Sequence, residues 1–141
     1  ISAYVDSRGF AGHLNQRGAV FEWVRLVDLQ PPSQFPDAGR MHWEGDTLVE
    51  RGMHTDYVEH WVREHADRSP SWGLTARGPV GDDAVLLRVG SLFGWAGPER
   101  VLVGKVDDDE WEALGIRLHG DELWAADTRW KITTTEGIVN L

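Results

Sequence analysis

Short runs of alternating apolar and polar residues follow one another along the whole chain, and turn-forming residues stand between them. Residues 40–44 show this best, because Met41 and Trp43 fall on one face of a strand and three polar residues on the other. The letters EGD then form a hairpin turn signal before a return strand over residues 47–51. The pattern therefore predicts a β-hairpin in the first half of the chain.

Further strands are expected on both sides of this hairpin. Residues 20–29 carry apolar side chains on both faces, so we expect this strand to be covered on both sides for part of its length. Residues 84–95 read as one long apolar strand, with Gly90 and Gly94 as bend or bulge positions. Many short strands between turns are typical of a β-sandwich or β-barrel. The other strand-like runs are residues 2–8, 10–16, 72–77, 101–106, 116–119, 123–126 and 130–135.

One short helix is expected over residues 107–114, which read DDDEWEAL. Acidic residues in the first turn favour a helix N-terminus, and Gly115 is a stop signal. Trp111 and Leu114 lie three residues apart and would share one face. The acidic run lacks the spacing of an EF-hand calcium loop, so we interpret it as the start of this helix.

The chain has 141 residues, which favours a single domain spanning residues 1–141. Its eight tryptophans indicate either a thick aromatic core or a pocket lined with rings. The formal net charge of −9 disfavours nucleic acid and anionic membranes as partners. The chain has no cysteine and shows no signal peptide, so we expect a cytoplasmic protein without disulfides or thiolate chemistry.

Several motifs in the first half of the chain are similar to those of a known protein group. They are FAG at residues 10–12, W-x-R-x-x-D-x-Q-P-P at 23–32, PDAG at 36–39, GDTL at 45–48, Glu50, Gly52, and Y-x-E-x-W-x-R at 57–63. This half of the chain resembles a group of largely uncharacterised bacterial proteins with a lipocalin-like, or calycin-type, barrel. The resemblance implies a mainly β fold, an antiparallel lipocalin-like β-barrel with one short helix. It implies a pocket but names no reaction.

Residues 57–65 fit two structures. Asp56 and Glu59 form a capping-box pattern, and Tyr57, Trp61 and other apolar residues fall on one helical stripe. In a strand, Tyr57, Glu59, Trp61 and Arg63 would share a face instead. Periodicity alone favours the helix, whereas the resemblance favours the strand, and we predict the strand.

Arg25 and Glu59 are the most informative charged residues, because each shares a predicted strand face with bulky aromatic side chains. A charge on an apolar face needs a partner, since unpaired burial is costly. We therefore expect Arg25 and Glu59 to face one interior, within reach of each other or of a shared ligand or water. Such a pair would either bind a polar group in a pocket or act as a structural bridge. The neighbouring rings are Phe21 and Trp23 beside Arg25, and Tyr57 and Trp61 beside Glu59.

Other chemistries find little support in the sequence. The six histidines are dispersed and show no recognised zinc spacing, so we expect no metal site. A haem held by one histidine stays open, but nothing selects which histidine would bind it. The chain also lacks G-x-S-x-G and the glycine-rich phosphate motifs, so we expect neither a serine hydrolase nor a nucleotide cofactor.

Three functional hypotheses follow. The first is a binding module, in which a small, mostly apolar molecule lies inside an aromatic-lined β-barrel and Arg25 and Glu59 fix its polar end. The second is a small barrel enzyme with lyase- or isomerase-like chemistry, in which Glu59 is the general acid/base and Arg25 or Tyr57 stabilises charge. The third is a structural or interaction domain with a solid core. The sequence leaves a homodimer open, and the predicted ligand-binding residues are Phe21, Trp23, Trp43 and Trp61.

Overall fold

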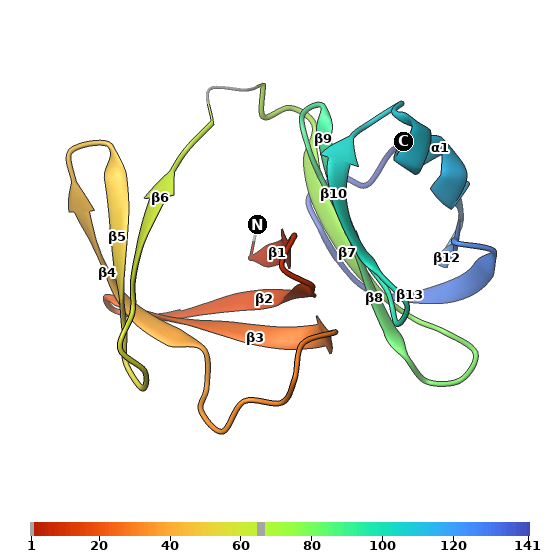
Figure 1. Ribbon diagram of the computed structural model, residues 1–141. Coiled ribbons are helices and arrows are strands. Elements are labelled where there is room, and N and C mark those ends of the chain that lie inside the picture. The colour runs from red at the N-terminus through yellow and green to blue at the C-terminus, as the bar shows by residue number, and fades with distance from the viewer. Residues whose placement is uncertain (1, 65–66) are drawn as a thin grey trace.

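The computed structural model describes residues 2–64 and 67–141. It is mainly β, with two curled antiparallel sheets and one short helix, α1 (Asp109–Leu114) (Figure 1). The mainly β fold and the single short helix predicted from the sequence are confirmed for the described residues. Asp108 caps the helix, because its carboxylate accepts a hydrogen bond from the Trp111 backbone N–H at 2.8 Å.

Sheet A contains the first six strands, which are hydrogen-bonded in chain order. They are β1 (Ala3–Asp6), β2 (Phe10–Arg17), β3 (Val20–Asp28), β4 (Ala38–Glu44), β5 (Thr47–Gly52) and β6 (Val58–Val62). The strand predicted over residues 57–65 is thus confirmed at its centre as β6, while His65 lies outside the described residues.

Sheet B contains the remaining strands in the order β10-β9-β8-β7-β13-β12-β11. They are β7 (Ser71–Arg77), β8 (Asp83–Val89), β9 (Leu92–Ala96), β10 (Val101–Lys105), β11 (Arg117–His119), β12 (Glu122–Ala125) and β13 (Thr128–Glu136).

The prediction of one strand over residues 84–95 is wrong, because β8 and β9 form an antiparallel hairpin. Gly90 lies at the turn with a φ of +60°, which favours glycine. A Cβ atom on Gly90 would also lie 1.8 Å from the carbonyl oxygen of Asp67. The glycine that we interpreted as a bend therefore ends the strand.

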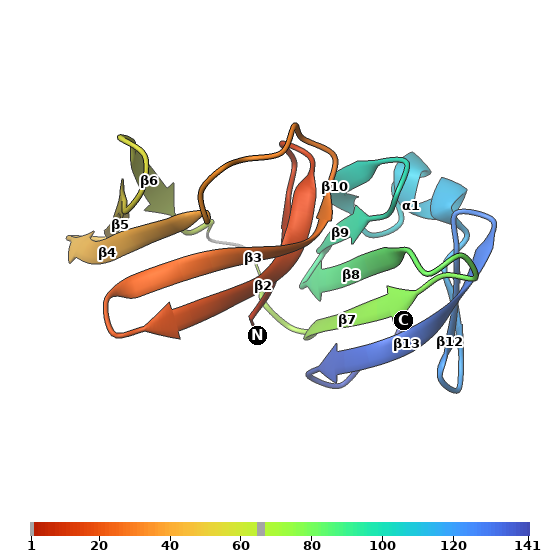
Figure 2. The ribbon, with the colours of Figure 1, turned by 90° about the horizontal axis from the view of Figure 1, so that it is seen from below.

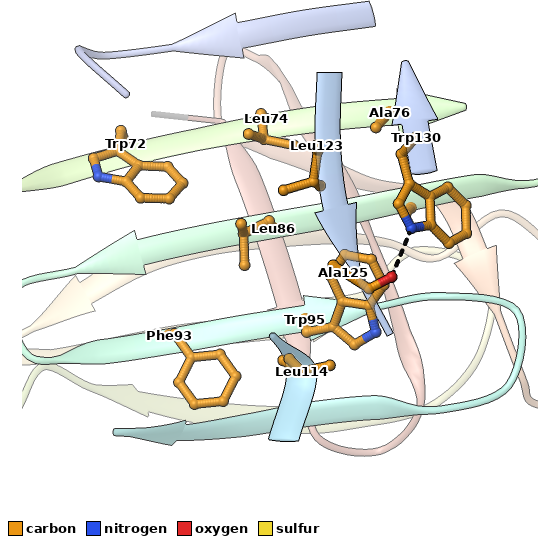
Figure 3. Packing of buried hydrophobic residues seen from close by; sticks show 11 residues of the cluster. Trp72, Leu74, Ala76, Leu86, Phe93, Trp95, Leu114, Leu123, Ala125 and Trp130 are labelled. Atoms are coloured by element: carbon orange, nitrogen blue, oxygen red, sulfur yellow. Dashed lines mark hydrogen bonds between the residues drawn. The ribbon is translucent and has the colours of Figure 1, made fainter. Parts of the chain in front are cut away.

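The inner face of sheet B surrounds an apolar core that α1 covers. Leu114 of α1 is 1% exposed and packs into this core, and Figure 3 shows the core side chains converging. The Trp130 indole N–H donates to the backbone carbonyl of Ala125 at 3.1 Å. The buried members of the core are Trp72, Leu74, Ala76, Ala84, Leu86, Phe93, Trp95, Leu114, Leu123, Ala125 and Trp130.

The outer face of sheet B packs against strands β1 to β3 of sheet A. Figure 2 shows β2 and β3 between strands β4 to β6 on one side and sheet B on the other. Val5 of β1 lies over Gly94, where an added Cβ atom would come within 2.7 Å of the Val5 Cβ. A second buried cluster of Ala11, Val27, Val85 and Ala96 joins the two sheets. Small residues at this junction allow the sheets to approach closely.

Sheet A curls because few residues pair between its two central strands, β3 and β4. Three residue pairs join β3 to β4, whereas eight join β2 to β3. Beyond this short contact the loop between β3 and β4 turns away, and β4 to β6 stand at a steep angle to β2 and β3 (Figure 1). The curl brings β3 and β6, which do not pair in the sheet, face to face across its concave side.

Candidate functional site

The concave side of sheet A gathers aromatic and charged side chains. The register places Trp23 of β3, Glu50 of β5 and Trp61 of β6 on this side, since Leu48 pairs with Trp61 and Glu50 with Glu59. The Trp23 and Trp61 rings stack with centroids 5.1 Å apart and planes at 21°. The Tyr4 and Trp23 rings form a T-shaped pair with centroids 4.9 Å apart. Elements from both ends of sheet A therefore meet in one aromatic cluster.

Glu50 lies beneath this cluster and is 1% exposed. Its Oε1 accepts hydrogen bonds from the indole N–H groups of Trp23 at 3.2 Å and Trp61 at 3.3 Å. Its Oε2 accepts the Tyr57 hydroxyl at 2.9 Å. One buried carboxylate therefore fixes three aromatic side chains, one from β3, one from β6 and one from the residue directly before β6.

Two glycines make room for this arrangement. A Cβ atom on Gly39 would lie 2.3 Å from Cγ of Glu50, so the carboxylate side chain crosses β4 where no side chain stands in its way. A Cβ atom on Gly52 would lie 2.5 Å from the Tyr57 ring. Both distances are far below van der Waals contact, so these positions require glycine unless the site rearranges.

Burial raises the pKa of the Glu50 carboxyl, and the hydrogen bonds from Tyr57, Trp23 and Trp61 offset part of the rise. Burial, followed by the hydrogen bond to Glu50, also raises the pKa of the Tyr57 hydroxyl. A tyrosine with a raised pKa stays neutral, so the Tyr57 hydroxyl donates a hydrogen bond to the Glu50 carboxylate. The indole N–H groups can only donate, so all three contacts favour the ionised form of Glu50.

Of the arrangements expected for Arg25 and Glu59, the direct ion pair is not formed, and each side chain has other partners. The Arg25 guanidinium contacts Asp37 at 2.8 Å and Asp28 at 3.1 Å, and it stacks over the Phe10 ring at 3.6 Å. Glu59 instead contacts Arg8 at 3.1 Å. Asp37 belongs to the loop between β3 and β4. The partner of Arg25 therefore comes from a segment that the alternation of residues along a strand does not describe.

Arg25 and Glu59 nevertheless line one cavity of about 190 Å³, together with the rings of Trp23, Tyr57 and Trp61. A larger cavity of about 430 Å³ lies along the edge of β3 and also includes Phe35. The two cavities share four lining residues, Trp23, Arg25, Asp37 and Tyr57. The larger volume falls within the range of small-molecule sites.

The other two predicted ligand-binding residues lie outside these cavities. Trp43 shares the concave face of sheet A, but it stands near the β4–β5 turn and is 61% exposed. Phe21 is half-buried on β3 and lines neither cavity. The structure therefore brings Trp23, Trp61, Tyr57, Arg25 and Glu59 to one cavity, and Trp43 and Phe21 line neither cavity.

Sequence reasoning did not assign Glu50 to the site. The signal was present, because Glu50 and Leu48 alternate on the return strand of the hairpin and Glu50 stands opposite Met41. Because Met41 and Trp43 share one face of the hairpin and Met41 pairs with Glu50, the register places the Glu50 carboxylate on the same face as Trp43. Arg8 and Asp37 were also missed, since both come from irregular segments that strand periodicity does not describe.

Within the described residues, no three His, Asp or Glu side chains gather in positions that could hold a metal ion. In the part of the chain that the structure describes, no helix has the length and apolar character needed to cross a membrane.

Comparison of the chain with known protein families, with curated proteins and with solved structures found no match.

Proposed function

We propose that this protein binds a small, mostly apolar molecule on the concave side of sheet A. The arrangement is like that of a lipocalin-like, or calycin-type, barrel, in which a curled antiparallel sheet surrounds the ligand. The ligand body lies against Trp23 and Tyr57, where the two cavities meet. Arg25 and Glu59 contact its polar end.

One observation carries this proposal: a buried carboxylate fixes the rings of Trp23, Trp61 and Tyr57. Burying a carboxylate is costly, and an apolar side chain of similar size fills a core as well or better. The hydrogen bonds set the orientation of the rings before a ligand arrives. A preorganised surface loses less entropy on binding, so this arrangement favours affinity.

The test is a titration with N-phenyl-1-naphthylamine, a neutral apolar fluorophore, monitored by its emission and by tryptophan quenching. We expect saturable binding that Trp23→Ala or Trp61→Ala weakens about tenfold or more, in keeping with loss of a ring from a binding site. The matched control is Trp124→Ala, which removes a half-buried ring from β12 of sheet B. Absence of saturable binding, or equal loss with Trp124→Ala, contradicts the proposal.

A second function is supported by the contact between Glu50 and Tyr57. Tyr57 lines both cavities, while Glu50 is buried directly behind it at 2.9 Å. An enzyme on this scaffold would use the Tyr57 hydroxyl to exchange a proton with substrate. Glu50 would accept a hydrogen bond from that hydroxyl and so position it. Glu59, the acid/base predicted from the sequence, would then lie at the cavity wall beside Arg8. Tyr57→Phe would abolish turnover while leaving far-UV circular dichroism unchanged.

A further inference from the structure

A separate cavity of about 190 Å³ lies at one end of sheet B and shares no lining residue with the two cavities of sheet A. Three hairpin turns surround it, those between β7 and β8, β9 and β10, and β12 and β13. Trp95 and Trp130, both buried, form its floor, and Figure 3 shows their rings at one end of the core. The closed core of sheet B therefore ends in a small open space above two indole rings.

The indole N–H of Trp95 opens into this cavity. Trp95 is 1% exposed, and among the described residues its N–H has no acceptor, whereas the Trp130 N–H donates to Ala125. The Trp72 N–H also lacks a partner there and is sealed from solvent, but the Trp95 nitrogen is not sealed. Gly97 lines the cavity beside this nitrogen, since an added Cβ atom would lie 3.3 Å from it. The N–H of a buried ring is thus presented to the cavity.

An indole N–H can only donate, so a ligand at this point must bring an acceptor. A hydrogen bond in a confined apolar space is stronger than one in water. The wall above the indoles is apolar where Pro79, Val80 and Pro98 line it. Asp82 lines the cavity too, and its Oδ1 is buried without a partner among the described residues. Its negative charge disfavours an anion, so the acceptor belongs to an uncharged group.

The volume of the cavity sets the size of the ligand. An apolar cavity of about 150 Å³ holds one benzene molecule. About 190 Å³ therefore accommodates a single ring with a small substituent. The three rings of N-phenyl-1-naphthylamine are too large for it, so that probe reports on sheet A alone.

We infer that this cavity is a second binding site, for a small uncharged molecule that has one aromatic ring and a carbonyl oxygen. The ring packs against Trp95, Trp130 and the prolines of the turns, and the carbonyl accepts the Trp95 N–H. This site does not depend on the binding proposed for sheet A.

The test is a ¹⁵N–¹H NMR titration of the indole N–H signals with three probes that each have one ring. Acetophenone carries a carbonyl oxygen, isopropenylbenzene replaces this oxygen by a CH₂ group, and benzoate carries a carboxylate. We expect acetophenone to shift the Trp95 signal with saturation, downfield of its position with isopropenylbenzene, because only the ketone accepts the N–H. The Trp72 signal should stay in place, and benzoate should bind weakest.

Trp95→Phe removes the N–H and keeps a ring. It should lower the affinity for acetophenone relative to that for isopropenylbenzene about threefold to tenfold, in keeping with the loss of one hydrogen bond. The matched control, Trp72→Phe, removes a sealed N–H at the other end of the core and should leave this ratio unchanged. The titration of the unchanged protein needs no variant to fold.

Saturable binding of acetophenone without a shift of the Trp95 signal overturns the inference. Absence of saturable binding, or tighter binding of benzoate than of acetophenone, also overturns it. If acetophenone shifts the Trp23 and Trp61 signals alone, the site in sheet B falls and the binding proposed for sheet A stands. Failure of N-phenyl-1-naphthylamine overturns only the proposal for sheet A.

Discussion

The two sheets bury tryptophan in different ways. In sheet B, the Trp130 N–H donates to a neutral backbone carbonyl five residues away, inside an otherwise apolar core that α1 closes. In sheet A, two indoles and a tyrosine donate to the carboxylate of Glu50, which is 1% exposed. A backbone carbonyl accepts the indole hydrogen bond without bringing a charge into the interior. A carboxylate accepts the same hydrogen bond but brings a charge that is buried with it.

The difference separates the scaffold in sheet B from the candidate site on the concave side of sheet A. Sheet B gains stability from close-packed apolar side chains, and its shape depends on volume. The concave side of sheet A depends on a network of polar contacts, which specifies orientation at a cost in stability. We therefore expect substitutions in sheet B to act on folding, and substitutions around Glu50 to act on ligand binding as well as folding.

The largest expected effect is in the scaffold. Trp95 is 1% exposed and forms a T-shaped pair with the Trp130 ring, with centroids 5.7 Å apart. Trp95→Ala should lower the free energy of unfolding by about 3–5 kcal/mol, since it removes a large side chain from a packed core. Trp43→Ala, at a position 61% exposed, is the control and should cost less than about 1 kcal/mol. Urea unfolding measures both, and equal losses would contradict the assignment of the core to sheet B.

Next in size is the carboxylate of sheet A. Glu50→Gln replaces one acceptor oxygen by an N–H₂ group that faces other donors, so it should lower the free energy of unfolding by about 1–3 kcal/mol. It should also weaken N-phenyl-1-naphthylamine, because the rings lose their fixed orientation. Glu59→Gln is the control for stability, as Glu59 stands opposite Glu50 in the register but pairs at the surface with Arg8. A Glu50→Gln protein as stable as the unchanged chain would break the comparison.

The free energy of unfolding should depend on pH through the raised pKa of Glu50. Because burial raises its pKa in the folded protein above the ordinary value of 4.5, the folded state binds more protons than the unfolded one in this range. Its contribution to stability is full below pH 4.5 and is lost as pH rises through the folded pKa. The stability difference between the unchanged chain and Glu50→Gln should therefore shrink with rising pH. A difference that grows with pH would show that hydrogen bonding outweighs burial.

The smallest expected effect concerns the partner of Arg25. A double-mutant cycle between Arg25 and Asp37 should give a coupling energy of about 0.2–1 kcal/mol, as is usual for partly exposed ion pairs. The same cycle between Arg25 and Glu59 should give none, because Glu59 contacts Arg8. A larger coupling for Arg25 and Glu59 than for Arg25 and Asp37 would contradict this assignment of partners.

Much of the fold could be predicted because strand and cap signals are local. The alternation of Met41 and Trp43, and the acidic start of the helix that Asp108 caps, each depend on a few neighbouring residues. The β8–β9 hairpin could not be separated this way, because an apolar run continues across its short turn at Gly90. The curl of sheet A depends on how β3 and β4 pair, which periodicity does not describe.

The site was predictable where it follows strand faces. The period of two placed Arg25 beside Trp23 and Glu59 beside Trp61, and the structure brings all four to one cavity. The choice of ion-pair partners was not predictable, because Arg8 and Asp37 reach the cavity from a turn and a loop. Nor did the sequence show that Glu50 is buried, since a glutamate on a strand is usually exposed.

The most direct test of the central claim is the set of indole N–H signals in a ¹⁵N–¹H NMR titration with N-phenyl-1-naphthylamine, assigned by Trp→Phe variants. The signals of Trp23 and Trp61 report the contacts with Glu50, and that of Trp130 reports the closed core of sheet B. We predict that the Trp23 and Trp61 signals shift with saturation while the Trp130 signal stays in place. A shift of the Trp130 signal with the other two unchanged would place the binding site in sheet B and contradict the account.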